Sequence, residues 1–163
     1  MKSVAAPLAA ALLLVFAAFS HAPAAEGETK IDLKSFQFKV ADEMMSLFGY
    51  DEAEGRLFYY TGGAAETTIK VPADGKYELV LRAACDPAQG ERAKFKVTLD
   101  GKEVGAEVGK ETLLTDDSPK DYVLALDATA GEHKLAVEFT NDAYKEGEYD
   151  RNFYLHGVTL KSK

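Results

Sequence analysis

The stretch TTIKVPADGKYELVLRAAC, residues 67–85, decides the fold because its apolar side chains alternate with polar ones on both sides of one turn. Before the turn, Thr67, Ile69 and Val71 share one parity. After the turn, the same period of two runs from Tyr77 to Cys85. Successive side chains of a β-strand point to opposite faces, so this pattern places the apolar residues on one face. The stretch predicts two strands that each bury one face.

The alternation recurs at short intervals along the rest of the chain. One such segment ends at Asp100-Gly101, which predicts a tight hairpin because glycine tolerates a positive φ, and the next strand is expected near Lys102. Residues 121–126 and 132–139 predict a further pair of strands across the turn DATAGE. Strands separated by Gly, Asp and Pro turns are typical of antiparallel sheets.

The whole pattern predicts an all-β fold. We expect roughly eight or nine short strands in an antiparallel β-sandwich of the jelly-roll type, a single domain over residues 26–163. The parity of apolar residues changes between Leu33 and Phe36 and again after Gly157, and each change predicts a β-bulge or a bend. Only residues 41–49, ADEMMSLFG, have helical spacing, enough for one or two turns.

The first 25 residues have the pattern of a secretory signal peptide. Lys2 precedes the apolar run VAAPLAAALLLVFAAF, and SHAPAA supplies small residues for cleavage near Ala25. We therefore expect a processed protein that is secreted or periplasmic. No later segment is apolar enough to predict a membrane span.

The amino-acid composition indicates which classes of partner the protein can bind. The chain has 19 basic and 27 acidic residues and a net charge of -8, which argues against nucleic acid as a partner. Acidic residues clustered in loops suit hard cations instead. The single cysteine, Cys85, excludes an internal disulfide and is expected to be a buried small apolar residue.

One segment gathers the polar residues that suit a cation. The segment is FTNDAYKEGEYDRNFYL, residues 139–155. Asn141 and Asp142 follow the end of one predicted strand, and Asp150 and Asn152 stand at the start of the next. Calcium accepts carboxylate, amide and main-chain oxygens together, whereas zinc prefers His or Cys and magnesium requires stricter geometry. The alternative is that these are ordinary turn and capping residues, with the basic side chains of the loop paired to neighbouring acids.

Aromatic residues of the same segment have two interpretations. Tyr144, Tyr149 and Tyr154 could stack on a sugar ring, with Arg151 beside them, or they could cover the edge of the sandwich. The absence of tryptophan argues against a flat surface for crystalline polysaccharide.

The motifs resemble those of a known family. VEFTND at residues 137–142, followed by DRNFYL at residues 150–155, is similar to the C-terminal half of the calcium-dependent, xylan-binding carbohydrate-binding modules of family 60, related to family 36. VPADGKYELVLRAACD and LDGKEVG extend the resemblance upstream, so that it covers residues 57–161. His156 stands where the family usually has Asp.

The resemblance implies a non-catalytic β-sandwich whose Ca²⁺ coordinates two neighbouring sugar hydroxyls. It implies Asp142 and Asp150 as metal ligands. Asn141 and Asn152 would add oxygens or hold the loop. A second loop is expected to bring Asp86 and Glu91 to the same edge as further candidate metal ligands. The four remaining candidates, expected to contact the sugar, are Tyr144, Tyr149, Tyr154 and Arg151.

The leading hypothesis is therefore a secreted non-catalytic protein that binds polysaccharide or oligosaccharide, xylan-like or another vicinal-diol glycan. The alternative is a secreted structural or protein-interaction sandwich with a purely structural calcium. An enzyme is disfavoured because the chain has no Gly-x-Ser-x-Gly elbow, no zinc-binding His pair and no Cys/His arrangement, although paired carboxylates could in principle hydrolyse a glycoside.

Overall fold

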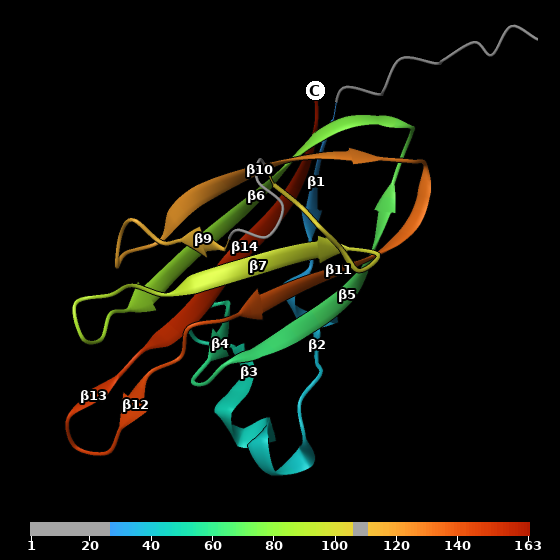
Figure 1. Cartoon of the computed structure of the whole chain (residues 1–163). Helices are drawn as coiled ribbons and strands as arrows, with labels where there is room; N and C mark the ends of the chain where they lie inside the picture. Colours follow the sequence, from blue (N-terminus) through green and yellow to red (C-terminus); the bar gives the residue numbers. More distant parts are fainter. Residues whose placement is uncertain (1–26, 106–110) are drawn as a thin grey trace, which may run out of the picture.

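Two antiparallel sheets pack face to face in the computed structural model, which describes residues 27–105 and 111–163 (Figure 1). The expected signal peptide, residues 1–25, lies outside the described residues. Sheet A has six strands: β10 (Lys120–Ala128), β6 (Gly75–Asp86), β14 (Asn152–Ser162), β4 (Arg56–Tyr59) and β3 (Phe48–Asp51) in that order, with β1 (Glu28–Ile31) paired to β14. Sheet B also has six: β2 (Gln37–Phe38), β5 (Gly63–Val71), β11 (Gly131–Phe139), β7 (Lys94–Leu99) and β8 (Lys102–Glu103), with β9 (Thr112–Leu113) paired to β7.

A separate hairpin, β12 (Tyr144–Lys145) and β13 (Tyr149–Asp150), projects from one end of the sandwich (Figure 1). Two 3₁₀ turns, η1 (Leu33–Ser35) and η2 (Asp42–Leu47), complete the described elements. The described residues include no helix long and apolar enough to cross a membrane.

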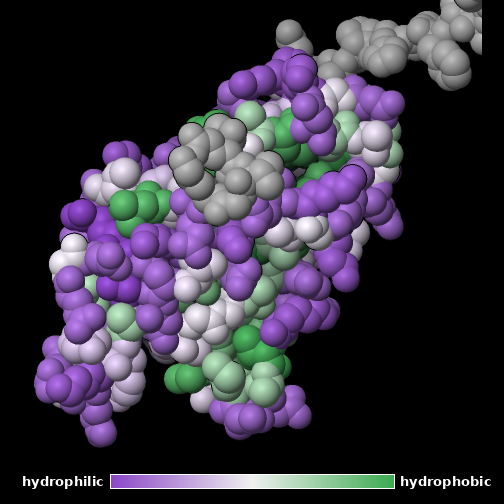
Figure 2. Space-filling model, viewed as in Figure 1, coloured by the Kyte–Doolittle hydropathy of each residue, from purple (hydrophilic) through white to green (hydrophobic). Residues whose placement is uncertain are grey.

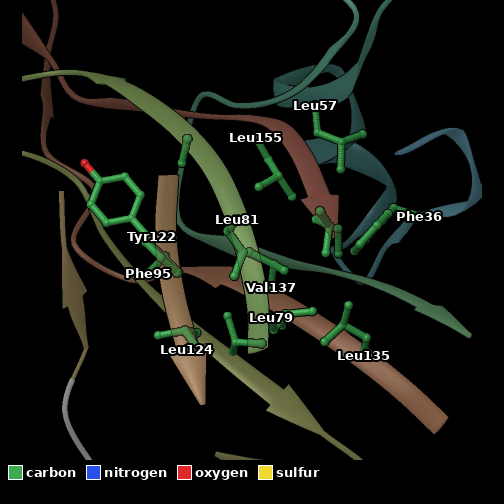
Figure 3. Packing of buried hydrophobic residues seen from close by; sticks show 14 of the residues in the cluster. Phe36, Leu57, Leu79, Leu81, Phe95, Tyr122, Leu124, Leu135, Val137 and Leu155 are labelled. Atoms are coloured by element: carbon green, nitrogen blue, oxygen red, sulfur yellow. The ribbon is translucent and has the colours of Figure 1, made fainter. Parts of the chain in front are cut away.

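The apolar parity of each strand faces the other sheet. Leu79 and Leu81 of β6 and Leu135 and Val137 of β11 are buried between the sheets, as Figure 3 shows. Each fully buried side chain of this kind contributes about 1.5–3 kcal/mol of transfer free energy. On the opposite surface of sheet B, Figure 2 shows mainly hydrophilic residues over β7, β11 and β5. The antiparallel sandwich is therefore confirmed, and Cys85 is buried as expected.

Local predictions are confirmed at three places. Asp100 and Gly101 have φ of 51° and 77° and join β7 to β8, which begins at Lys102. The pairing of β14 with β6 shifts register between Leu155 and Gly157, which is the expected bulge. The expected short helix is the 3₁₀ turn η2.

Two topological expectations are wrong. Residues 121–126 and 132–139 do not pair, because β10 joins β6 in sheet A while β11 joins β5 and β7 in sheet B. Alternation shows which side of a strand is buried, and this connection crosses between the sheets so that the two buried sides face each other. The number of strands is also higher, because several of the fourteen in the described residues have only two residues.

The parity change between Leu33 and Phe36 has a similar cause. The chain leaves β1 in sheet A, makes the turn η1 and enters β2 in sheet B. The apolar residues before and after the change therefore belong to strands of different sheets. The chain bends between these strands and forms no bulge within one strand.

An ion pair stabilises the β7–β8 hairpin against the start of β11. Nδ1 of His133 lies 2.7 Å from Asp100 Oδ2, and its Nε2 lies 2.8 Å from the Thr129 carbonyl oxygen. Both partners are acceptors, so both bonds form only when both ring nitrogens carry a proton. The Asp100 bond, followed by the Thr129 bond, raises the pKa of His133, and the His133 bond lowers the pKa of Asp100.

This pair predicts a pH dependence of stability. Because the pKa of His133 is raised on folding, its contribution is complete below its ordinary pKa of about 6.5 and is lost as pH rises through the raised value. Because the pKa of Asp100 is lowered, its contribution is present above about 3.9 and is lost as pH falls through the lowered value. Urea unfolding midpoints of the calcium-free protein should fall between pH 6 and about 9 more for the wild type than for His133→Gln. Equal pH profiles would show that the pair contributes nothing.

Candidate functional site

The candidate site lies where β11 ends, β14 begins and the β12–β13 hairpin leaves the sandwich. Tyr144 pairs with Asp150, and the backbone N–H of Arg151 donates to the Ala143 carbonyl at 2.9 Å. The two chain segments at the base of the hairpin are therefore antiparallel neighbours. This register places Asp142 across from the start of β14.

Asn152 lies between two carboxylates at the start of β14. Its Nδ2 is 3.2 Å from Asp86 Oδ2 and 3.3 Å from Asp150 Oδ2. The pairing of β14 with β6 causes this approach, because Asn152 and Asp86 are direct neighbours across the ladder. Its Oδ1 is buried and has no hydrogen-bond partner among the described residues.

Asp142, like Asn152, has a buried side-chain oxygen without a hydrogen-bond partner among the described residues. Its Oδ2 accepts a hydrogen bond of 2.8 Å from the Thr61 hydroxyl, and its Oδ1 is buried without a hydrogen-bond partner among the described residues. A buried acceptor with no partner costs about 1–3 kcal/mol, and more when it is charged. A bound cation would satisfy this oxygen and Oδ1 of Asn152.

Arg151 has a role that differs from the predicted sugar contact. Its side chain is only 4% exposed, and its guanidinium donates to main-chain carbonyls of Glu91, Asn141 and Ala88. These bonds join the β6–β7 loop to the segment that follows β11. Arg151 is therefore a buried positioning residue, which corrects the prediction.

Asn141 also holds the second loop in place. Its Oδ1 accepts from the Lys94 backbone N–H at 2.6 Å, and its Nδ2 donates to the Arg92 carbonyl at 3.0 Å. Both ends of the side chain are used, which fits the expected loop-holding role rather than metal ligation. Glu91 is at the tip of the loop with its side chain 59% exposed, 3.6 Å from the Arg151 guanidinium.

The three candidate tyrosines lie in different surroundings. Tyr144 is 63% exposed, and Tyr149 is partly exposed on the next strand of the hairpin. Tyr154 is buried, the Arg56 guanidinium covers its ring at 3.9 Å, and its hydroxyl donates to Asp86 Oδ2 at 2.6 Å. Burial, followed by the bond to Asp86, raises the pKa of Tyr154. Its ring is not an open sugar platform, so this expectation is corrected.

Two residues of the site escaped sequence reasoning. Thr61 binds Asp142, and Tyr60 is 40% exposed with its ring 6.4 Å from that of Tyr154. The signal was the run LFYYT, in which Leu57 and Tyr59 face the core while Phe58 and Tyr60 face outward.

The donor set favours a cation that accepts neutral oxygens. No three His, Cys, Asp or Glu side chains converge on a point suited to a metal within residues 27–105 and 111–163. A metal here would therefore need amide or main-chain oxygens beside the carboxylates, as calcium accepts and zinc does not. His156 lies outside this donor set, and burial, with Arg56 and Arg82 nearby, lowers its pKa.

Comparison with known proteins agrees with this chemistry. The family model CBM60, described as a Ca-dependent, xylan-binding carbohydrate-binding module, matches residues 78–163. No curated protein sequence matches the chain.

Several solved structures with similar folds are carbohydrate-binding modules. The C-terminal CBM6 of a marine laminarinase from Zobellia galactanivorans has a TM-score of 0.53 at 13% identity, over 83% of this chain and 100% of that one. A family 35 module from Clostridium thermocellum has a TM-score of 0.53 at 13% identity, over 84% and 99%. A CBM6 from Cellvibrio mixtus lichenase 5A, in complex with cellotriose, has a TM-score of 0.52 at 14% identity, over 83% and 97%. At these identities the likeness concerns the fold.

Proposed function

Because the chain belongs to the Ca-dependent, xylan-binding carbohydrate-binding modules of family 60, we propose that it binds a xylan-like glycan through calcium held beside the β12–β13 hairpin. The protein would bind carbohydrate without catalysing a reaction on it. The observation that carries the calcium site is the pair of buried oxygens without partners, Oδ1 of Asp142 and Oδ1 of Asn152, on neighbouring chain segments.

Three side chains would hold the ion. Asp142 and Asn152 would supply their Oδ1 atoms and Asp150 a carboxylate oxygen, while Asp86 would orient the Asn152 amide. Calcium takes about six to eight oxygens, so these side chains leave positions for main-chain oxygens, water and an external ligand. When bound, the ion would supply coordination of sugar hydroxyls in place of water.

The remaining residues of the site keep these oxygens in place. The Tyr154 hydroxyl and the Asn152 amide both donate to Asp86 Oδ2, which orients that carboxylate. Thr61 does the same for Asp142. Exposed Tyr144 and partly exposed Tyr149 lie on the hairpin, where a ring could cover a bound sugar.

The test is calorimetric titration of xylotetraose into the full chain, with saturating calcium and then with chelator. We expect heat of binding with calcium and none after chelation. No binding in either condition would reject the glycan function. A melting temperature that rises with calcium while no glycan binds would favour the alternative, a structural calcium in an interaction module. We also propose that the first 25 residues direct export as a secretory signal peptide, because Lys2 precedes an apolar run that ends in small residues near Ala25.

A further inference from the structure

The outer face of sheet A next to the candidate site carries a row of rings that ends in an arginine. Tyr154 of β14 lies opposite Phe58 of β4, and Arg56 and Tyr60 flank Phe58 at alternate positions on the same side. The Phe58 and Tyr60 rings stack with centroids 4.6 Å apart. We call Arg56, Phe58, Tyr60 and Tyr154 the outer strip.

The outer strip is continuous with the candidate site. The Tyr154 hydroxyl donates to Asp86, whose same oxygen accepts from Asn152. From Tyr60 to Arg56 the strip runs about 13 Å along the strand, from the rise per residue of a β-strand. A ligand that spans it would extend past a single sugar ring.

The backbone of β3 gives the strip a fixed shape. A Cβ added at Gly49 would lie 2.7 Å from the Phe58 ring, so this ring occupies the space that a side chain at Gly49 would need. The Phe58 ring therefore packs over Gly49 of β3 and stacks on that of Tyr60, a residue that is 40% exposed.

Arg56 has donors that no described residue accepts. Its guanidinium carbon lies over the Tyr154 ring, 3.9 Å from the ring centroid, a cation–π contact that holds the group beside the ring. Its Nε is buried with no hydrogen-bond partner among the described residues. The nearest carboxylate, Asp51, is 3.9 Å from Nε, and its Oδ1 accepts from the backbone N–H groups of Ala53 and Glu54.

Another arginine on the same face, Arg82, differs from Arg56 in its exposure and in its hydrogen bonds. Arg82 of β6 is more exposed, at 54% of its side chain, and donates to Asp121 Oδ1 at 3.1 Å. Arg56 is only 23% exposed, stacks on a ring and has no such bond. Because Nε of Arg56 is buried, a ligand would reach the two terminal nitrogens of the guanidinium, and a planar guanidinium offers these to a carboxylate in a bidentate manner.

We propose that the outer strip binds an acidic sugar of the same glycan that the calcium site engages. The Tyr60 and Phe58 rings contact the apolar face of the sugar, and the Arg56 guanidinium donates to its carboxylate. This proposal rests on the proposed function and names the ligand class: a glycan with uronic acid substituents.

The experiment compares two probes by calorimetry in saturating calcium: xylotetraose and the same chain carrying a glucuronic acid branch. A hydrogen bond to a charged group predicts that the wild type binds the acidic probe about tenfold more tightly. In Arg56→Gln the ratio of the two affinities should fall to near one, and in Arg56→Lys, which keeps the charge without the planar fork, it should be intermediate. Tyr60→Ala should weaken the binding of both probes.

Arg82→Gln is the matched control and should keep the wild-type ratio. Equal affinities for the two probes in the wild type, or the same loss of preference in Arg82→Gln, would overturn the acidic-sugar proposal while leaving the calcium site intact. Binding of neither probe would reject the proposed function and the outer strip together. Melting temperatures of each variant confirm that it is folded before binding is measured.

Discussion

Arg151→Met is expected to lower the free energy of unfolding by about 3–5 kcal/mol, since it removes charged hydrogen bonds to three carbonyls and leaves a buried gap in polar surroundings. The side chain is 4% exposed, so water cannot simply replace it. Urea denaturation of the calcium-free chain measures the effect without a contribution from bound metal.

Arg92→Met is the matched control on the same loop. Arg92 pairs with Asp117 at 2.7 Å, but both side chains are roughly half exposed, and exposed pairs contribute about 0–1 kcal/mol. Losses of equal size in the two variants would contradict the positioning role of Arg151. Arg151→Lys should recover only part of the stability, because one ammonium cannot reach all three carbonyls.

Asp142→Asn is expected to weaken calcium binding by about a hundredfold, because calcium affinity depends on the number of charged ligands. The substitution keeps the size of the side chain and an oxygen for the Thr61 hydroxyl. In the wild type, calcium at a hundredfold excess over its dissociation constant should stabilise the fold by about 2.7 kcal/mol. At the same calcium concentration the variant should show little increase in melting temperature.

Asp127→Asn is the control for loss of one negative charge. Asp127 pairs with Lys76 on the surface, where both side chains are 76% exposed, and it lies on β10 away from the hairpin. Its calcium response should equal that of the wild type. If Asp142→Asn also responds like the wild type, Asp142 is not a ligand.

The sequence predicts the faces of the strands better than their partners. The alternation from Thr67 to Cys85 gave two strands with buried faces, and Asp100-Gly101 gave a hairpin, because both signals are local. Residues 121–126 and 132–139 were expected to pair, yet they lie in opposite sheets. Both arrangements bury the same side chains, so the alternation does not distinguish a hairpin from a crossing between sheets.

The sequence also predicts which residues lie at the candidate site better than it predicts their roles. Spacing placed Asp142 and Asn152 at strand ends that meet, and the ladder brings Asp86 to Asn152. Charge and aromatic character alone suggested sugar contacts for Arg151 and Tyr154, but both are buried and bonded to protein atoms. Burial of a polar residue depends on the loops that pack over it, and these loops are far apart in sequence.

The acidic-sugar preference and the calcium site depend on different atoms. The first depends on the Arg56 guanidinium on the outer face of sheet A, and the second on the buried oxygens of Asp142 and Asn152. The acidic-sugar preference can therefore be absent while the calcium site stands, because Arg56 belongs to β4 and donates no hydrogen bond to either of these oxygens among the described residues.

An anomalous difference map from crystals grown with calcium would locate the ion itself. We expect one calcium peak about 2.3–2.6 Å from Oδ1 of Asp142 and Oδ1 of Asn152, with Asp150 among its ligands and at least one position filled by water or sugar. If the protein binds xylotetraose in calcium and the map has no peak between Asp142 and Asn152, the ion that supports glycan binding is not held at this site.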